Sequence, residues 1–247
     1  MASFFRTIRG VLLADPAIVL ATILFGTASL IVSFFDETGY VQIRVARAWA
    51  RTLLAVSGVN VRVEGLEQID PQGSYVFISN HLSYMDTPVA LAHIPVQFRF
   101  LAKRGLFQIP FLGQHLGRAG HIPVPREDPR AAVKTMQLAA ETIQRKKTSL
   151  LIFPEGGRSR DGRLQSFKEG GAYIAIRAGV PVVPLVMIGT RNVLRFGGGI
   201  VRAGDVTLRI LKPLETRHLT LKDRGTLTSE LRQLIARELE QRNETSG

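Results

Sequence analysis

The sequence predicts an α/β fold in which a mixed, largely parallel sheet is flanked by helices. Short apolar or alternating runs, typical of strands, recur after residue 58, at 59–65, 74–79, 98–102, 120–125, 149–153, 180–189 and 205–211. Segments with helical periodicity lie between several of these runs, and this alternation predicts parallel strands joined by helices. With 247 residues, 45% of them hydrophobic, the chain can build one large core or a domain with an appendage.

The N-terminal region predicts a long apolar helix. Residues 16–35 carry no charge, and as a helix they would extend about 30 Å, the thickness of a hydrocarbon core. A signal peptide and a buried core helix are the alternatives. The run is longer than a usual signal segment and no small-residue cleavage site follows it. Membrane association is therefore the preferred interpretation.

A second, amphipathic helix is predicted to follow the apolar one. Arg44, Arg47 and Arg51 share one helical face, and Trp49 lies among the apolar residues. Such a helix suits anionic headgroups, although a domain-packing helix with a solvated arginine face would show the same pattern. Because cations flank the apolar run on both sides, two in-plane helices joined by a turn at 35–39 fit at least as well as a single span. The predicted division is a membrane-associated segment, 1–58, and an α/β domain, 59–247.

The later helices carry clear boundary signals. Asp128 and Pro129 predict the start of a helix, and Gly179 predicts the end of the next one. The apolar stripe of the first contains Val133, Met136, Ala140 and Ile143. The stripe of the last helix contains Leu227, Leu231, Leu234, Ile235 and Leu239.

Charge and composition limit the function classes. The net charge of +12 predicts anionic partners, and the absence of cysteine excludes disulfides and thiolate chemistry. Nucleic acid is disfavoured, because aromatic residues are only 7% and are not interleaved with basic ones. His115 and His121 lack carboxylate or cysteine neighbours at metal-ligand spacing, so they are interpreted as structural or substrate-lining and no metal is expected.

Three polar clusters follow predicted strands, where sites gather in α/β sheets. They are "NHLSYMD" at 80–86, the long segment 103–126, and "FPEGGRS" at 153–159. In the first, His81 and Asp86 are five residues apart, so neither a helix nor a strand would bring them together. Taken alone, His81 could be structural and Asp86 could belong to a capping box with Ser83. If the two residues pair, His81 must leave the strand and Asp86 must lie in the first turn of the next helix.

Together these motifs resemble those of the 1-acylglycerol-3-phosphate acyltransferases and their glycerolipid acyltransferase relatives. That family carries an H-x4-D block and, later, an F-P-E-G-[T/G]-R-S block. A further family block resembles "VPVVPL" at 180–185, and the resemblance extends from about residue 40 to 212. Two positions depart from the pattern: Gly157 replaces a commoner threonine, and Pro125 replaces an acidic residue.

The resemblance implies a mechanism and a set of site residues. His81 would act as general base toward a hydroxyl, and Asp86 would fix its tautomer. The acceptor's phosphate and its surroundings would involve Lys103, Arg126, Glu155, Gly156, Arg158 and Ser159. The apolar residues of the first motif (Leu82, Tyr84 and Met85) would touch either acyl chain or core. No cofactor is expected beyond the acyl thioester itself, carried by acyl carrier protein or coenzyme A.

The resemblance thus implies a membrane-associated enzyme that moves a fatty acyl group to the 2-hydroxyl of lysophosphatidic acid, giving phosphatidic acid. Its expected partners are anionic membrane lipids, lysophosphatidic acid and the acyl thioester, at the cytoplasmic face of the inner cell membrane. Two alternatives remain open at this point. One is another phospholipid or glycerol-3-phosphate acyltransferase of the same superfamily, and the other is a basic, non-enzymatic lipid-binding module.

Overall fold

A seven-stranded sheet forms the centre of the computed structural model, which describes residues 10–125 and 127–245. Each neighbouring pair of strands is parallel except the β6–β7 pair, which is antiparallel. The predicted class, a mixed and largely parallel sheet, is confirmed. In spatial order the strands are β1 (Val59–Glu64), β7 (Gly204–Ile210), β6 (Val182–Ile188), β2 (Val76–Ser79), β5 (Ser149–Ile152), β3 (Phe98–Lys103) and β4 (Ile122–Val124).

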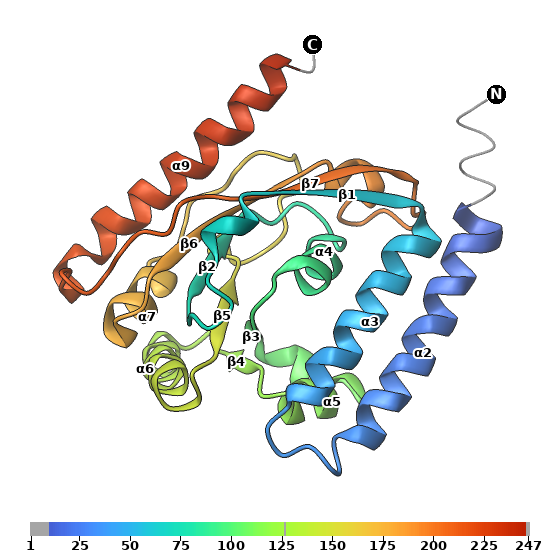
Figure 1. The fold of residues 1–247 in the computed structure, drawn as a ribbon, viewed down its shortest axis with the longest axis horizontal. Helices are drawn as coiled ribbons and strands as arrows, with labels where there is room; N and C mark the ends of the chain where they lie inside the picture. The colour runs from blue at the N-terminus through green and yellow to red at the C-terminus, as the bar shows by residue number, and fades with distance from the viewer. Residues whose placement is uncertain (1–9, 126, 246–247) are drawn as a thin grey trace.

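Helices cover both faces of this sheet (Figure 1). On one face pack α3 (Tyr40–Ser57) and α4 (Asp86–His93), and on the other pack α6 (Pro129–Lys146), α7 (Gly170–Ala178) and α9 (Arg224–Thr245). Strands β2 and β5 are buried throughout because they lie at the centre and are covered on both sides. The predicted boundary signals hold: the Asp128 side chain accepts hydrogen bonds from two backbone amides at the start of α6, and Gly179, at φ 67°, ends α7.

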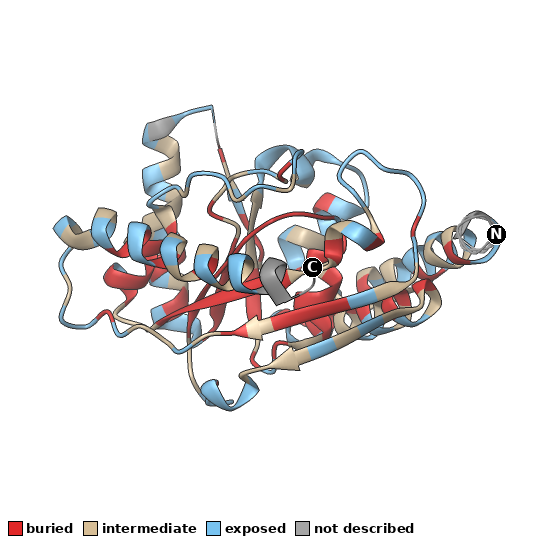
Figure 2. Ribbon diagram, turned by 90° about the horizontal axis from the view of Figure 1, so that it is seen from above, coloured by how far each residue is buried: buried red, intermediate tan, exposed pale blue. Residues whose placement is uncertain are grey.

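The predicted N-terminal helix pair is present. The helix α2 (Asp15–Val32) follows a π-helical turn, η1 (Gly10–Ala14), and packs along α3. Within the described residues, one helix is long and apolar enough to cross a membrane, and it covers Leu12–Val32. Only one side of this helix touches protein, and exposed and intermediate residues dominate it near the N-terminus marked in Figure 2.

The Asp36 side chain builds the turn between the two helices. Its carboxylate accepts hydrogen bonds from the backbone amides of Thr38, Gly39, Val41 and Gln42, the last two at the start of α3. Gly39 adopts φ 73°, a conformation that disfavours other residues, and a Cβ there would meet the Ala119 carbonyl oxygen at 2.9 Å. The turn therefore sets the helix pair against the helix that ends at Arg118.

Several short elements were not predicted. They are η2 (Leu66–Gln68), η3 (Arg104–Gln108), α5 (Leu112–Arg118), α8 (Thr190–Val193) and η4 (Leu221–Asp223). They were missed because each is too short for a periodic pattern to emerge. The most important is α5, which lies at the foot of α2 and α3 (Figure 1) and closes one end of the space behind them.

Candidate active site

The sheet itself brings two of the three polar motifs together. Strands β2 and β5 are parallel neighbours, and Ile78 pairs with Ile152. His81 and Glu155 each follow three residues later, so the two loops leave the sheet at the same level. After β2 the chain passes to α4 on one face, and after β5 to α7 on the other. In such folds, a divergence of this kind at the carboxyl ends of parallel strands forms the crevice that usually holds the site.

His81 and Asp86 form a buried pair in this crevice. The Nδ1 atom of His81 lies 2.8 Å from Oδ2 of Asp86, which is the first residue of α4. The same oxygen accepts hydrogen bonds from the backbone amides of Leu82 at 2.7 Å and Ser83 at 2.8 Å. The five-residue spacing is therefore spanned by an irregular turn that the carboxylate itself closes. As predicted, His81 lies at the exit of the strand and Asp86 in the first helical turn.

A ring contact and two backbone hydrogen bonds fix the position of His81. Its ring stacks on Phe153 with centroids 3.8 Å apart and an interplanar angle of 14°. Its backbone amide donates to Oε1 of Glu155 at 2.6 Å, and its carbonyl accepts from the amide of Ser159 at 2.9 Å. The neighbouring Asn80 is also fixed, because its side-chain amide exchanges two hydrogen bonds with the backbone of Met187 in β6. The ring therefore has little freedom to turn.

Glu155 is a bridge between backbone segments. One carboxylate oxygen accepts from the His81 amide and the other from the Gln165 amide at 2.9 Å. Burial raises the pKa of Glu155 above its usual value, although the two backbone hydrogen bonds oppose the shift. Gly156 follows with φ 78°, where glycine is strongly favoured, and a Cβ there would lie 3.2 Å from Nζ of Lys168.

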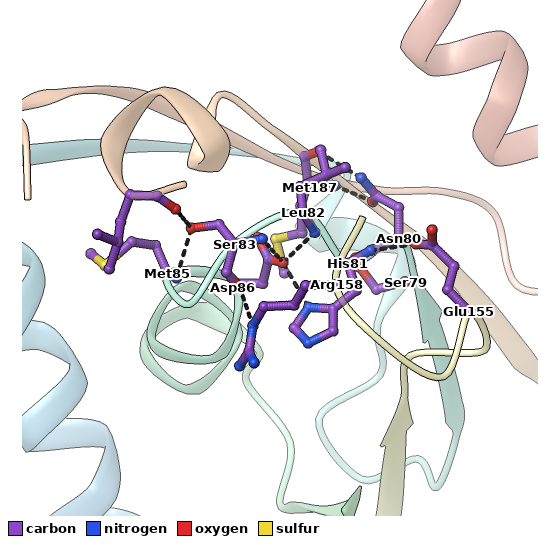
Figure 3. Close-up of polar contacts among 11 residues, drawn as sticks. Ser79, Asn80, His81, Leu82, Ser83, Met85, Asp86, Glu155, Arg158 and Met187 are labelled. Carbon is purple, nitrogen blue, oxygen red and sulfur yellow. Dashed lines mark hydrogen bonds and ion pairs between the residues drawn. The ribbon is translucent and has the colours of Figure 1, made fainter. Parts of the chain in front are cut away.

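Arg158 lies on the same side of the crevice as the imidazole. Its Nε donates to the Ser83 carbonyl at 3.1 Å, and its guanidinium lies over the Tyr84 ring, 4.1 Å from the centroid. No hydrogen bond from its two terminal nitrogens to another described residue is found, and Figure 3 shows them directed to the same side as the His81 ring. Burial lowers the pKa of Arg158 from its usual high value. This side chain offers a fixed fork of donors to an anion.

The three other predicted acceptor residues differ in their surroundings. Ser159 is buried, and its hydroxyl donates to Asp161 and accepts from the Gly162 amide, so its polar groups are used within the protein. Lys103 is exposed at the carboxyl end of β3. Arg126 lies outside the described residues. Among the departures from the family pattern, Gly157 has open space around it, since a Cβ there would meet nothing within 4 Å.

The predicted membrane-binding residues of α3 face different surroundings. Arg44 and Arg51 are exposed, as expected for headgroup contact. The guanidinium of Arg47 instead donates to the carbonyls of Ile94, Pro95 and Val96, just beyond the end of α4. Trp49 is half-buried between the helices, and its Nε1 donates to the Thr22 hydroxyl at 3.1 Å. Arg47 and Trp49 therefore hold the helices in place.

An apolar cavity of about 620 Å³ lies between the helix pair and the sheet domain. It is bordered by α2, α3, α4 and α5, and by Phe100 of β3 and His121, which directly precedes β4. Thr87 lines it, and Thr87 directly follows Asp86 of the pair. The lining of this apolar space thus includes the residue next to the buried carboxylate.

Sequence reasoning missed several residues that complete the site. Phe153 stacks on the histidine ring and Asn80 fixes the exit of the strand. Tyr84 was predicted to touch acyl chain or core, but it is exposed and its ring lies under the Arg158 guanidinium. Phe153 and Asn80 flank the polar residues of the motifs, which was the available signal. Their contacts were not predictable, because they connect residues more than seventy positions apart. Among the described residues, no group of three or more His, Asp or Glu side chains is placed to hold a metal.

Comparison with known proteins agrees with this geometry. The family model described as Acyltransferase matches residues 60–188, more than half of the chain, and this range includes both motifs. The chain belongs to the acyltransferase family. This membership confirms the resemblance seen in the sequence.

Several relatives of this chain are named 1-acyl-sn-glycerol-3-phosphate acyltransferase. The chloroplastic 1-acyl-sn-glycerol-3-phosphate acyltransferase of Arabidopsis thaliana is 36% identical over 69% of the chain, but the match spans 48% of that relative. The chain thus spans about half the length of this plant relative. A relative of the same name from Chlamydomonas reinhardtii is 30% identical over 94% of the chain and 70% of its own length.

A solved structure of the family extends the likeness to the whole fold. The crystal structure of the 1-acyl-sn-glycerophosphate acyltransferase PlsC from Thermotoga maritima matches with a TM-score of 0.77 and 25% sequence identity. The match covers 96% of this chain and 98% of that one. It includes the N-terminal helix pair, so the pair is part of the shared fold of both proteins.

Proposed function

We propose that this acyltransferase moves a fatty acyl group from a thioester to the 2-hydroxyl of 1-acyl-glycerol-3-phosphate, forming phosphatidic acid. The observation that carries the proposal is the 2.8 Å contact between His81 Nδ1 and Asp86 Oδ2, next to the forked donors of Arg158. The names of the relatives supply the substrate class. The donor is the thioester of acyl carrier protein or coenzyme A.

The dyad prepares His81 to act as a base. A carboxylate can only accept at Nδ1, so this nitrogen carries the proton and Nε2 carries the lone pair. Nε2 takes the proton of the 2-hydroxyl while that oxygen attacks the thioester carbonyl carbon. The carbon–sulfur bond then breaks, and the imidazolium returns the proton to the leaving thiolate. Asp86 stabilises the transient imidazolium, as the aspartate of a serine-protease triad does.

Arg158 gives the site its preference for a phosphorylated acceptor. The hydrogen bond to Ser83 and the stack on Tyr84 fix the plane of the guanidinium, so its two terminal nitrogens are preorganised for phosphate oxygens. Glu155 and Ser159 act on the backbone of His81 and position the ring. We assign them positioning roles. Gly156 permits the turn, and the roles of Lys103 and Arg126 at the acceptor remain proposals from the family pattern.

The donor's acyl chain is assigned to the 620 Å³ cavity. Its lining is overwhelmingly apolar and includes Thr87, the residue next to Asp86 of the dyad. A cavity of this size can remove most of a long chain from water. A chain lying there would place its thioester carbonyl at the crevice that holds His81.

We propose that the helix pair holds the site at a lipid surface, and we assign it to the cytoplasmic face of the cell membrane. Because α2 packs along α3, and α3 packs on α4, the apolar helix lies against the body of the protein along its length. Its outer side exposes large apolar residues, including Val19, Leu20 and Leu24. An in-plane position in one leaflet therefore fits better than a crossing helix. We accordingly propose residues 1–58 as a membrane-binding segment and 59–247 as the acyltransferase domain.

An acyl-transfer assay on the purified full-length chain tests this function. Labelled acyl thioester would be supplied with lysophosphatidic acid, glycerol-3-phosphate or another lysophospholipid in parallel. We expect phosphatidic acid as the main product, and its loss in His81→Ala. Preferred turnover of glycerol-3-phosphate would identify a different member of the superfamily. Lipid binding without turnover of any acceptor would indicate a non-enzymatic lipid-binding module.

A further inference from the structure

The segment 106–112 presents apolar side chains to solvent at the foot of the helix pair. Its sequence is "LFQIPFL", and Phe111 is 72% exposed. Leu106, Ile109 and Leu112 beside it are also exposed. Several large apolar side chains gathered in seven residues are unusual on a water-facing surface, where such residues are normally scattered singly.

The backbone at Phe111 is strained. Phe111 has φ 63° and ψ −53°, and the Leu112 amide donates across it to the Pro110 carbonyl at 2.7 Å. This is a γ-turn of the rare positive-φ type, which disfavours a bulky side chain. At Gly113 a Cβ would lie 2.0 Å from the Phe107 carbonyl oxygen, so the start of α5 is packed hard against η3. Glycine would suit position 111, yet an exposed phenylalanine occupies it.

Phe111 lines the cavity, but this contact involves only part of its side-chain surface. Together with Pro110 and Leu112 it lines the 620 Å³ cavity, as do Ile23 and Gly26 of α2. Most of its ring still points to solvent. The wall of the cavity therefore does not by itself account for a strained aromatic residue at this place.

This segment is joined to the end of α2 through α5, which begins at the last residue of the segment. The end of α2 lies against α5: Ser29 Oγ is 2.7 Å from Nδ1 of His115, and Arg118 donates to the Ser33 hydroxyl and lies over the Phe34 ring. Phe34 and Phe35 are both strongly exposed beside this contact. The segment 106–112 and α2 thus line the same cavity, and the exposed Phe34 and Phe35 lie beside the contact that joins them.

The charge around the segment matches a lipid surface. Residues 87–126 contain no aspartate or glutamate, whereas Lys103 and Arg104 are exposed just before the segment. Apolar side chains that are flanked along the sequence by cations and not by acidic residues are typical of elements that enter the headgroup layer of an anionic membrane.

Given that α2 lies on lipid, as proposed above, we infer that residues 106–112 form a second membrane-inserting element, which enters the same leaflet with Phe111 at its tip. The cavity is then bordered by two elements in contact with lipid, α2 and residues 106–112. The sequence places this stretch within the polar cluster 103–126, in which only Lys103 and Arg126 are assigned to the acceptor's phosphate, so residues 106–112 carry no other role there.

Single-cysteine probes test the insertion directly, because the native chain has no cysteine. Phe111→Cys, Leu24→Cys and Leu138→Cys are each labelled with an environment-sensitive fluorophore in the full-length protein. Leu24 is exposed on α2, and Leu138, 52% exposed on α6 of the opposite face, is the matched control. With vesicles of phosphatidylethanolamine and phosphatidylglycerol, we expect a blue shift at 111 and 24, quenching there by spin-labelled acyl chains, and neither effect at 138.

The outcomes separate this inference from the proposed function. A probe at 111 that stays aqueous while the probe at 24 shifts would overturn the second element and leave the helix anchor intact. If the probes at 24 and 111 both stay aqueous, the membrane position of α2 is wrong as well. A blue shift at 111 without vesicles, in a chain that elutes as a dimer, would assign the patch to a second copy and overturn the inference.

A pair of substitutions distinguishes a lipid role from a structural one. Phe111→Gly relieves the strained φ, so we expect its melting temperature to be unchanged or higher than that of the native chain. We expect its partition onto the same vesicles to weaken about tenfold, because a large apolar side chain is lost. Leu138→Ser should leave partition unchanged. A lower melting temperature with unchanged partition in Phe111→Gly would show that Phe111 only supports the fold.

Discussion

Asp86 uses a single oxygen atom to bind the His81 ring and to close the turn between the two residues. Oδ2 accepts from the imidazole and from the amides of Leu82 and Ser83, while Oδ1 is buried with no hydrogen-bond partner among the described residues. Orientation of the base and closure of the loop are therefore one structural feature. The spacing of the H-x4-D motif follows from this, since the carboxylate must reach back over the four intervening residues.

Substitutions of Asp86 should separate the catalytic effect of its charge from the structural effect of its hydrogen bonds to the turn. In Asp86→Asn the amide oxygen can still accept from the two backbone amides, so we expect a small loss of stability. We expect kcat to fall by about 10²–10⁴-fold, because the imidazolium loses its counter-charge. Acyl-transfer kinetics and thermal unfolding measure the two effects.

Asp86→Ala and His81→Ala are the comparison variants. Asp86→Ala leaves two buried amides unsatisfied, at about 1–3 kcal/mol each, so it should lose both stability and activity. His81→Ala should lose comparable activity and unfold closer to the native chain. If Asp86→Asn keeps native kcat, the carboxylate has no catalytic part and serves only the turn.

Arg158 should control affinity for the phosphorylated acceptor. Arg158→Lys keeps the positive charge but loses the Nε bond to Ser83 and the planar stack on Tyr84. We expect the KM for lysophosphatidic acid to rise about tenfold or more, since charged hydrogen bonds contribute about 1.5–3 kcal/mol, with little change for the donor. The exposed Arg163 in the same loop offers a matched control, Arg163→Lys. An increase confined to the donor KM would move Arg158 to the thioester side.

His121 should make the fold sensitive to acid. Burial, with the charges of His115 and Arg99 nearby, lowers the pKa of His121 to about 3. The unfolded chain takes up this proton near pH 6.5, so between pH 6.5 and 3 it binds more protons than the folded chain. The free energy of unfolding must therefore fall as the pH falls through this window, by at most about 1.4 kcal/mol per pH unit from this residue.

His121→Asn tests that origin. The asparagine oxygen can replace Nδ1 as acceptor for the Phe100 amide, which His121 binds at 2.9 Å, and it does not titrate. Both chains are unfolded with denaturant between pH 7 and pH 4, roughly the window of the shift. As the pH drops, the free energy of unfolding should fall less for the variant than for the native chain. His218→Asn, at an exposed position, is the control. Parallel curves for the native chain and His121→Asn would exclude His121 as the cause.

The strands and the dyad were predictable because their signals are local. Residues 76–79 form a short apolar run, and Asp86 opens a helix just before Thr87 and Pro88, so the fold of this region follows from neighbouring residues. Family membership then confirmed the identity of the motifs. The relation between β2 and β5 was expected only in general terms, since parallel strands place their carboxyl ends together.

The contacts of the helix pair were not predictable in the same way. Arg47 and Arg51 lie one turn apart on the predicted cationic face, yet Arg47 binds three carbonyls beyond α4 and Arg51 is exposed. Which side of an amphipathic helix meets protein depends on tertiary packing, and periodicity shows only that two sides exist. The γ-turn at Phe111 escaped prediction for a related reason, because its backbone is unfavourable for the residue that occupies it.

Filling the cavity should shorten the acyl chain that the enzyme accepts. Gly26 of α2 lines the cavity, and a Cβ there would meet nothing within 4 Å, so Gly26→Leu can extend into the empty space. Replacing glycine within a helix also removes a penalty of about 0.5–1 kcal/mol, so the variant should fold at least as well as the native chain. We expect kcat/KM to fall about tenfold or more for the longest donor chains and to stay unchanged for short ones.

Gly117 provides the matched control for this variant. It lies in α5, a Cβ there would also meet nothing within 4 Å, and it does not line the cavity. Gly117→Leu removes a helical glycine in the same way, so it should leave the chain-length profile unchanged. A panel of acyl donors of increasing length, assayed with one lysophosphatidic acid, compares the two variants. If Gly26→Leu lowers turnover equally for all donors, the acyl chain lies elsewhere and the cavity has another occupant.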